Sequence, residues 1–589
     1  MCGIAGFISS NVEYDSGGIV RRMLDHITYR GPDQIGIGQY GSCTMGMVRL
    51  SICDTAKHEI PIGDAGGKRR IVYNGEIYNA ENIRRSLKNQ MPLRTRSDAE
   101  IALRSYGEKG IDALKDFNGM YALAIWDGVA DEVIVARDKV GEKPIYYVQG
   151  RDFFAFASEM KCLLEVVEPE LNTEAYSYWA FEFTCGKETL FKHIFALEPG
   201  EFIRIADGRV TILSYWKIWD NLIDVPADYQ RVKKDLTELI YDAVTLRTNN
   251  CAHSYGVLIS GGLDSALVAC ITKPDVLFTC HYDLGKDFDE LAYAQLVAKK
   301  VGRELIVIEP TPEDFLRTEK DIAYHLDTPC TWTSFSWWML MEAVSRHVKV
   351  VMTGDGADEA FGGYHRYLLL HHDEQIHKMD AMAQYAYLID RYYGSPVERY
   401  AKLISRCENQ HMDEVRDYVT HLAGSYFSKM NGDIVHSMGI TDVYSTMQVL
   451  LQMSDRMSMA FGVENRSPFL DHRLLQYAFS MSSEFKIKNG VTKTVLKDIA
   501  REFIPAAIAD RIDKRGFSAP INRWFGLEKH GKYNRTFYRK RVFEAWEQLF
   551  VRGRRRQILP EYPKAEHPLS LYFANGKRQH YAAAGHHHC

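Results

Sequence analysis

The fold of the larger part of this chain is decided by the stretch Tyr255-Gly256-Val257-Leu258-Ile259-Ser260-Gly261-Gly262-Leu263-Asp264-Ser265. An apolar run, a glycine turn and the helical spacing of residues 265–271 predict a buried strand that leads directly into a helix. Glycines let the backbone approach phosphates closely, and the helix N-terminus supplies N–H donors and a positive dipole end. The turn has no Gly-Lys-Ser/Thr sequence and is therefore not a P-loop. We expect a phosphate-binding turn of another kind.

Strands and helices continue to alternate after this turn. Residues 276–282, 305–308 and 348–352 have the composition of buried strands, and residues 290–301 have helical spacing. This alternation predicts a parallel, doubly wound α/β sheet. Residues 370–505 are expected to be mainly helical.

A second polar motif ends the strand predicted at 348–352. It reads Thr353-Gly354-Asp355-Gly356-Ala357-Asp358-Glu359. The motif should lie at the carboxyl edge of the sheet, where folds of this kind bind their ligands.

The first 165 residues have a different texture. Short strands are predicted at 71–73, 121–126, 132–136, 145–148 and 153–157, separated by glycine-containing turns, and helices at 81–88 and 98–108. The pattern indicates a layered α+β domain, mostly antiparallel.

Cys2 follows the initiator methionine within Met1-Cys2-Gly3-Ile4-Ala5-Gly6. Removal of Met1 would place a thiol and a free α-amino group on one residue. The amine has an unperturbed pKa of roughly 7.7–8, against about 8.5 for the thiol, so it can take the thiol proton near neutral pH. Cys2 is therefore a candidate nucleophile that carries its own general base.

The composition excludes several classes of protein. The chain has 589 residues, 46% hydrophobic and 25% charged, which fits two or three globular domains. A net charge of −5 does not suit a nucleic-acid-binding protein. The most apolar segment, Ser334–Val344, is too short to span a bilayer, and no secretory signal is visible. The 11 cysteines form no C-x-x-C pair. We expect a cytoplasmic protein without nucleic-acid or membrane partners.

The N-terminal motifs, taken in order, resemble those of class II glutamine amidotransferases, specifically the glutaminase half of asparagine synthetase. They include Arg30-Gly31-Pro32-Asp33, Gly46-Met47-Val48-Arg49-Leu50-Ser51, Asn74-Gly75-Glu76-Ile77-Tyr78-Asn79 and Ser97-Asp98. The resemblance implies an Ntn-hydrolase sandwich, with antiparallel sheets between helices, over residues 2–210.

The family's residue roles fit this sequence. Cys2 would attack the glutamine amide, and Asn74 and the Gly75 N–H would form the oxyanion hole. Arg49 would bind the substrate α-carboxylate, and Asp98, with Glu76 nearby, would face the α-ammonium. Met47 stands where the family usually has a histidine.

The second half resembles the N-type ATP pyrophosphatases, and asparagine synthetase in particular, over residues 232–526. The resemblance implies cleavage of ATP between its α and β phosphates, with Mg²⁺ held by Asp264 and Asp358. Asp355 stands where the best-known enzymes have a glutamate that is a candidate base, and Lys493 would neutralise phosphate charge. The implied ATP-binding residues are Leu258, Ser260, Gly261, Gly262, Asp264, Ser265 and Gly354. Residues 527–589 are expected to be a divergent, solvated tail.

Together the two halves imply an ATP-dependent carbon–nitrogen ligase of asparagine and amino-acid biosynthesis. Glutamine would be hydrolysed at Cys2, and ammonia would cross the domain interface to attack an acyl-AMP, giving an amide, glutamate, AMP and pyrophosphate.

The acceptor is left open by the sequence. The first hypothesis is aspartate. The second is another carboxylate, such as a uronic sugar, a peptide or a specialised-metabolite acid, with a glutamine analogue as an alternative nitrogen donor. A third, a catalytically silent regulatory or scaffold protein, predicts the loss of polar residues that are present. A homodimer is expected only by analogy with the family.

Overall fold

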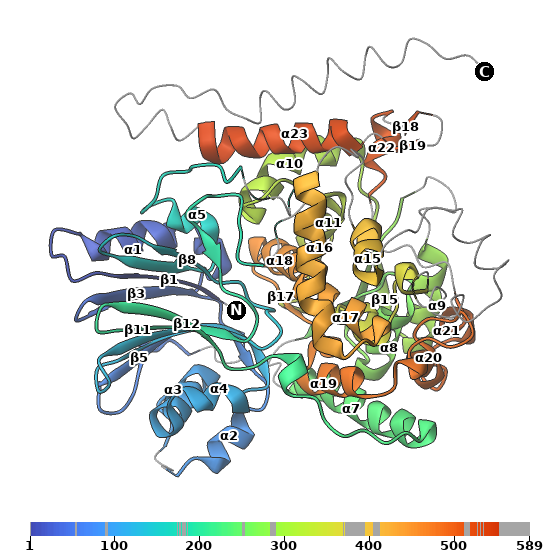
Figure 1. Ribbon diagram of the computed structural model, residues 1–589, viewed down its shortest axis with the longest axis horizontal. Helices are drawn as coiled ribbons and strands as arrows, with labels where there is room; N and C mark the ends of the chain where they lie inside the picture. The colour runs from blue at the N-terminus through green and yellow to red at the C-terminus, as the bar shows by residue number, and fades with distance from the viewer. Residues whose placement is uncertain are drawn as a thin grey trace.

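A computed structural model of the protein describes residues 2–52, 56–88, 92–173, 175, 178, 184, 186–249, 254–282, 290–368, 370, 395–404, 413–511, 519–526, 528–529, 532–533 and 535–552. A β-rich half formed by the N-terminal part packs against a larger half in which helices surround a parallel sheet (Figure 1).

The N-terminal half contains two six-stranded antiparallel sheets. Their strand orders are β10-β8-β9-β1-β3-β2 and β12-β11-β7-β6-β5-β4. The first sheet consists of β1 (Cys2–Ile8), β2 (Gln34–Tyr40), β3 (Cys43–Arg49), β8 (Tyr146–Gln149), β9 (Phe154–Ala157) and β10 (Phe195–Ala196). The second consists of β4 (Ile62–Gly63), β5 (Arg69–Ile77), β6 (Gly119–Asp127), β7 (Glu132–Arg137), β11 (Glu201–Ala206) and β12 (Arg209–Ser214).

Helices cover the outer faces of both sheets. On the first lie α1 (Ser16–Asp25) and α5 (Met160–Leu163), and on the second α2 (Ala80–Ser86), α3 (Asp98–Lys109) and α4 (Ala113–Asp116) (Figure 1). This helix–sheet–sheet–helix arrangement confirms the predicted Ntn-type sandwich.

The second half is built on a five-stranded parallel sheet of order β15-β14-β13-β16-β17. Its strands are β13 (Tyr255–Leu258), β14 (Val276–Cys280), β15 (Glu304–Ile308), β16 (Val350–Met352) and β17 (Glu464–Arg466). The chain builds outward from β13 to β14 and β15, and then returns to place β16 on the other side of β13. Such a switch point is where doubly wound sheets open a ligand crevice, so the predicted α/β fold is confirmed.

Helices make up most of the remainder. Around the sheet lie α7 (Tyr229–Asn249), α8 (Leu263–Thr272), α9 (Leu291–Val301), α10 (Pro312–Leu326), α11 (Trp332–Val344) and α12 (Ala357–Phe361). The helical C-terminal part contains α15 (Pro396–Ile404), α16 (Asp413–Phe427), α17 (Ile434–Tyr444), α18 (Thr446–Ala460), α19 (His472–Ser480), α20 (Thr494–Ala500), α21 (Ala506–Ala509), α22 (Ile521–Trp524) and α23 (Arg535–Glu547), with the small hairpin β18 (Glu528–Lys529) and β19 (Lys532–Tyr533). Within the described residues, no helix is both long enough and apolar enough to cross a bilayer.

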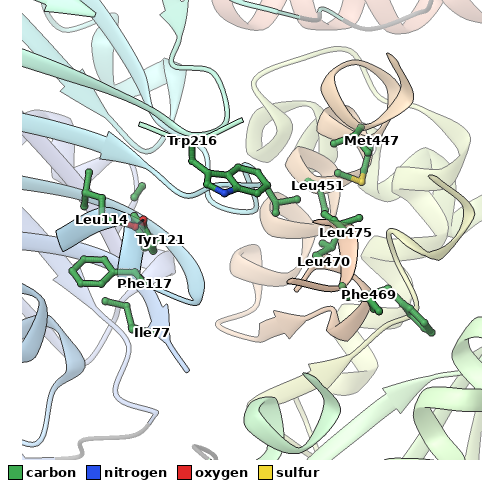
Figure 2. Close-up of a cluster of buried hydrophobic side chains, with 14 of the residues drawn as sticks. Ile77, Leu114, Phe117, Tyr121, Trp216, Met447, Leu451, Phe469, Leu470 and Leu475 are labelled. Atoms are coloured by element: carbon green, nitrogen blue, oxygen red, sulfur yellow. Dashed lines mark hydrogen bonds between the residues drawn. The ribbon is translucent and has the colours of Figure 1, made fainter. Parts of the chain in front are cut away.

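The two halves share one hydrophobic core. Figure 2 shows Phe117 and Tyr121 of the β6 region on one side, Leu451 and Leu475 of α18 and α19 on the other, and Trp216 between them. Because this cluster is continuous and buried, the sandwich and the parallel sheet are held in a fixed relation by apolar packing.

Three features differ from what the sequence suggested. The sequence predictions did not include strands β1, β2, β3, β4, β10, β11, β12, β17, β18 and β19. Among these, β1, β3 and β17 are buried on both faces and show no regular alternation of polar and apolar residues. The expected domain limit at residue 210 falls inside β12, which pairs with β11 as far as Ser214.

The third difference is in the segment expected to be a solvated tail. Within it, α23 packs against α10 and fully buries Trp546, whose indole N–H donates to the Asp327 carbonyl oxygen (2.8 Å). Residues 535–552 are thus part of the packed body. The rest of that segment, residues 553–589, lies outside the described residues.

Candidate active sites

The first candidate site is built by the starts and ends of three strands. Cys2 opens β1 and pairs with Arg49, the last residue of β3. Asn74, Gly75 and Glu76 lie near the end of β5 in the opposite sheet. The backbone nitrogen of Cys2 donates to Asn74 Oδ1 (2.9 Å), so the two sheets meet at the thiol-bearing residue.

A pocket with about 480 Å³ of empty space, open to solvent, lies beside Cys2. It brings together five of the residues predicted from sequence, which are Cys2, Arg49, Gly75, Glu76 and Asp98. Met47, His58 and Tyr73 complete much of its wall.

The amide of Asn74 is held ready to donate. Asn74 is completely buried, its Oδ1 is used by Cys2, and its Nδ2 has no hydrogen-bond partner. A buried donor without a hydrogen-bond partner lowers the stability of the folded state, so Nδ2 is a candidate donor to a bound ligand. The adjoining residue has to be glycine, because a Cβ on Gly75 would lie 2.1 Å from the Met120 carbonyl oxygen.

Side chains of opposite charge also line this pocket. Arg49 Nη1 donates to the Ala56 carbonyl (2.8 Å), which fixes its guanidinium. Asp98 opens α3 and accepts from the Tyr73 hydroxyl (2.6 Å) and the Ile77 N–H (2.7 Å). Burial raises the pKa of Asp98, and these two hydrogen bonds oppose the rise.

The thiol of Cys2 is in an environment of competing effects. Burial raises its pKa, whereas the N-terminal ammonium, a hydrogen bond from the Leu50 backbone and the charge of Arg49 lower it. An adjacent proton acceptor is therefore needed to generate the thiolate near neutral pH.

His58 is a pocket residue that sequence reasoning missed. Its Nδ1 lies 3.2 Å from the Ala56 carbonyl, the same oxygen that accepts from Arg49. It stands in the wall together with Met47, which replaces the family histidine. No local pattern around residue 58 could have indicated this position.

The second candidate site lies at the switch point between β13 and β16. Its pocket has about 790 Å³ of empty space and contains seven of the predicted residues. Leu258, Ser260, Asp264 and Ser265 come from the β13 side, and Gly354, Asp355 and Asp358 come from the β16 side. Thr333 and Trp337 of α11, Leu450 and Met453 of α18, and Tyr364 also line it.

The turn after β13 is shaped by its glycines and by one distant arginine. Gly261 has φ +69°, a conformation that favours glycine, and Gly262 is the N-cap of α8. Arg511 Nη1 donates to the Gly261 carbonyl (3.1 Å), while its Nη2 pairs with Glu290 (2.8 Å).

Lys493 lies between the two predicted metal-binding carboxylates. Its Nζ is 2.7 Å from both oxygens of Asp264 and 2.6 Å from Asp358 Oδ1. The fold thus joins Asp264, Asp358 and Lys493, which are far apart in sequence. Two carboxylates already converge on one positive charge, and their oxygens are the ligands that Mg²⁺ prefers. Among the described residues no group of three or more His, Cys, Asp or Glu could hold a metal alone, so phosphate oxygens would have to complete a magnesium site.

Asp355 belongs to a short hydrogen-bonded chain. The Thr353 hydroxyl donates to Asp355 Oδ2 (2.8 Å) and lies 2.8 Å from the Ser467 hydroxyl. Nearby, the Tyr364 hydroxyl donates to Glu359 (2.6 Å). Burial and the neighbouring Asp358 raise the pKa of Glu359 to about 7.

The fold and the two sites define an N-terminal glutamine amidotransferase of the Ntn type joined to an ATP-pyrophosphatase. Residues 1–216 match the glutamine amidotransferase domain, and residues 235–580 match asparagine synthase. Because the second match covers more than half of the chain, the protein belongs to the asparagine synthase family.

Similar proteins span nearly the whole chain. Asparagine synthetase [glutamine-hydrolyzing] 1 of Bacillus subtilis (strain 168) is 29% identical, with 90% of this chain and 88% of that protein covered. Amidase chry2 of Gibberella zeae is 25% identical, with 90% and 91% covered. Among solved structures, glutamine phosphoribosylpyrophosphate amidotransferase from B. subtilis is 16% identical, with 60% of this chain and 82% of that chain covered. Its TM-score of 0.29 is too low to show a common fold.

Proposed function

We propose that the protein is a glutamine-dependent amidotransferase that uses ATP to activate a carboxylic acid. It is an ATP-dependent, glutamine-hydrolysing ligase of the asparagine synthetase type. The observation that carries the glutaminase part is the pocket beside Cys2, together with the buried, unsatisfied amide of Asn74, whose Oδ1 accepts from the Cys2 nitrogen. This arrangement does not suit a catalytically silent scaffold protein. A buried donor without a partner lowers the stability of the fold, and a protein without activity would gain nothing from keeping it.

At the first site, the thiol of Cys2 attacks the glutamine side-chain carbonyl. After Met1 is removed, the α-amine of Cys2 takes the thiol proton and returns it to the leaving ammonia. The amine is oriented by Asn74 Oδ1, which already accepts from this nitrogen (2.9 Å). The developing oxyanion is stabilised by Asn74 Nδ2 and the Gly75 N–H. Water then hydrolyses the thioester to glutamate.

The amino-acid end of glutamine is held by the charged residues of the pocket. Arg49 pairs with the α-carboxylate, and Asp98 and Glu76 face the α-ammonium. All three line the pocket with Cys2, so a bound glutamine can reach the charged groups and the thiol at once.

At the second site, the turn after β13 and the Gly354 backbone bind ATP, with Leu258, Ser260 and Ser265 in the same wall. Asp264 and Asp358 would hold Mg²⁺, which neutralises phosphate charge when bound. Lys493, now paired with both carboxylates, would turn to the phosphates. Asp355 would serve as the base that takes a proton from the attacking ammonia.

Ammonia passes between the sites inside the protein. Free ammonia is mostly protonated at neutral pH and then cannot act as a nucleophile. The continuous buried interface between the halves is compatible with a route shielded from water.

We propose aspartate as the first candidate acceptor, in line with the asparagine synthetase named among the similar proteins. A second candidate is an acid with an apolar body. Its support is the apolar side of the pocket, formed by Trp337, Leu450 and Met453, together with Asp355 in place of the usual glutamate. Among the described residues that line this pocket there is no arginine or lysine to pair with a second carboxylate.

Two experiments test the function. Cys2→Ala should abolish glutamine-driven amidation and retain the ammonia-driven reaction; retained glutamine-driven activity would contradict the assignment. A pyrophosphate-release screen, with aspartate first and then aromatic and aliphatic acids, identifies the acceptor. Formation of ADP instead of AMP would rule out an adenylate. We also propose that the glutaminase domain extends to the end of β12 and that the synthetase domain includes α23. A cytoplasmic location and a homodimer are further proposals.

A further inference from the structure

The short strand β17 lies between the two candidate sites. It is the edge strand of the parallel sheet, paired with β16 so that Glu464 faces Val350 and Arg466 faces Met352. Figure 1 shows β17 in the middle of the molecule, close to the N-terminus. Both Glu464 and Arg466 are completely buried.

One set of contacts connects β17 to the glutamine pocket. Arg466 Nε pairs with Glu464 (2.6 Å), and Arg466 Nη2 lies 4.0 Å from the carboxylate of Glu76. Glu464 in turn acts electrostatically on the thiol of Cys2 and raises its pKa. A synthetase-domain ion pair therefore adjoins both the nucleophile and a residue proposed to bind the substrate ammonium.

A second set of contacts connects β17 to the nucleotide pocket. The Arg466 carbonyl accepts from the Thr353 N–H (3.1 Å), and the Ser467 hydroxyl lies 2.8 Å from the Thr353 hydroxyl. The same Thr353 hydroxyl donates to Asp355 (2.8 Å). One residue, Arg466, thus contacts one site through its side chain and the other through its backbone.

We propose that Arg466 is a positioning residue for glutamine, and that β17 is the strand through which the occupancy of the nucleotide pocket acts on Glu76. The proposal rests on the function given above. Arg466 holds Glu76 in the orientation that receives the substrate ammonium. Its guanidinium is also anchored by the Arg247 carbonyl (Nη1 to O, 2.5 Å), so a shift of the Thr353 segment is passed to Glu76 instead of being absorbed by a mobile side chain.

The physical basis is the cost of a buried, incompletely paired charge. Removing Arg466 takes away the cation that pairs with Glu464 and lies 4.0 Å from Glu76, so Glu76 loses the charge that orients it toward the substrate position. A coupling between the two sites must be reciprocal for the binding equilibria, so nucleotide should tighten glutamine binding and glutamine should tighten nucleotide binding.

The test uses the full-length protein and measures glutamate release at varied glutamine, with and without α,β-methylene-ATP and Mg²⁺. In the wild type the nucleotide analogue should lower the KM for glutamine by at least about fivefold. In Arg466→Met the KM without nucleotide should rise at least about fivefold while kcat stays within about twofold, as expected when only binding is lost. Arg466→Lys, which keeps the charge, should recover part of the affinity.

Two further variants separate coupling from stability. Ser467→Ala removes only the hydroxyl that faces Thr353, and it should retain the basal KM but lose most of the response to the nucleotide analogue. Arg247→Met is the matched control. It removes an equally buried guanidinium that pairs with Asp471 but keeps the backbone carbonyl that anchors Arg466, so the basal KM should be unchanged.

Three results would overturn the inference alone. They are a wild-type KM that does not respond to the analogue, an unchanged KM in Arg466→Met, and an equal rise of KM in Arg247→Met. A wild-type protein that releases no glutamate from glutamine would overturn the proposed function as well.

Discussion

Replacing Asn74 with alanine isolates the stabilisation of the transition state from the binding of glutamine. Asn74 Nδ2 has no partner in the free protein, so removing it breaks no existing hydrogen bond of that atom. Loss of one oxyanion donor costs about 10²–10³ in kcat, or about 2.7–4 kcal/mol. Loss of the Oδ1 contact with the Cys2 nitrogen adds about 0.5–1.5 kcal/mol to the destabilisation of the folded state.

The expected signature of Asn74→Ala is a large fall in kcat for glutamate release with little change in the KM for glutamine. Such a pattern marks an interaction made only in the transition state. Ammonia-driven amidation in the same preparation is the internal control and should be retained. A fall of less than about tenfold in kcat would refute the oxyanion-hole reasoning. An equal loss of the ammonia-driven reaction would show that the substitution damages the fold.

Three other predictions concern the synthetase site, the pH dependence of stability and the C-terminal helix. Lys493→Met should lower acceptor-dependent pyrophosphate release by about 10²-fold or more, because Asp264 and Asp358 lose their shared cation. Glutamate release, measured on the same sample, should stay intact. Burial raises the pKa of Glu142 to about 8, above its value of about 4.3 in an unfolded chain, so the folded state keeps a proton that the unfolded state releases in this range. Stability should therefore fall as pH rises from about 4.5 to 8, and Glu142→Gln should reduce the fall, as read from Tm at several pH values. Trp546→Ala should destabilise the fold by about 3–5 kcal/mol in denaturant unfolding, because it empties a fully buried site under α23.

The sequence predicted many elements well where a local signal was strong. The strand–glycine–helix pattern around Ser260 gave β13 and α8 within a few residues, and the helix predicted at 98–108 begins at Asp98 as α3 does. It missed β1 and β17, in which both faces are buried and the polar/apolar alternation that identifies a strand is absent. It also missed the packing of α23. The composition of residues 527–589 is polar and basic, and composition does not reveal that one tryptophan, Trp546, is buried.

The candidate sites divide in the same way. Cys2, the Asn74-Gly75 pair and Asp264 could be singled out from short motifs, since each motif carries a recognisable chemical requirement. His58 and Ser467 could not, because each reaches its site through a distant strand or loop and has an ordinary local sequence. The role proposed for Arg466 belongs here too, because nothing in its local sequence indicates that it contacts the glutamine pocket.

What the sequence determined by itself was the chemistry available and the two domain architectures, because both depend on residue types within a few positions of one another. Only the tertiary structure decided how those chemistries meet. The ion pairs of Lys493 with Asp264 and Asp358, and the position of Arg466 beside Glu76, join residues more than 100 positions apart. Such contacts depend on sheet order and on packing between the halves, and neither property is encoded in any short stretch of the chain.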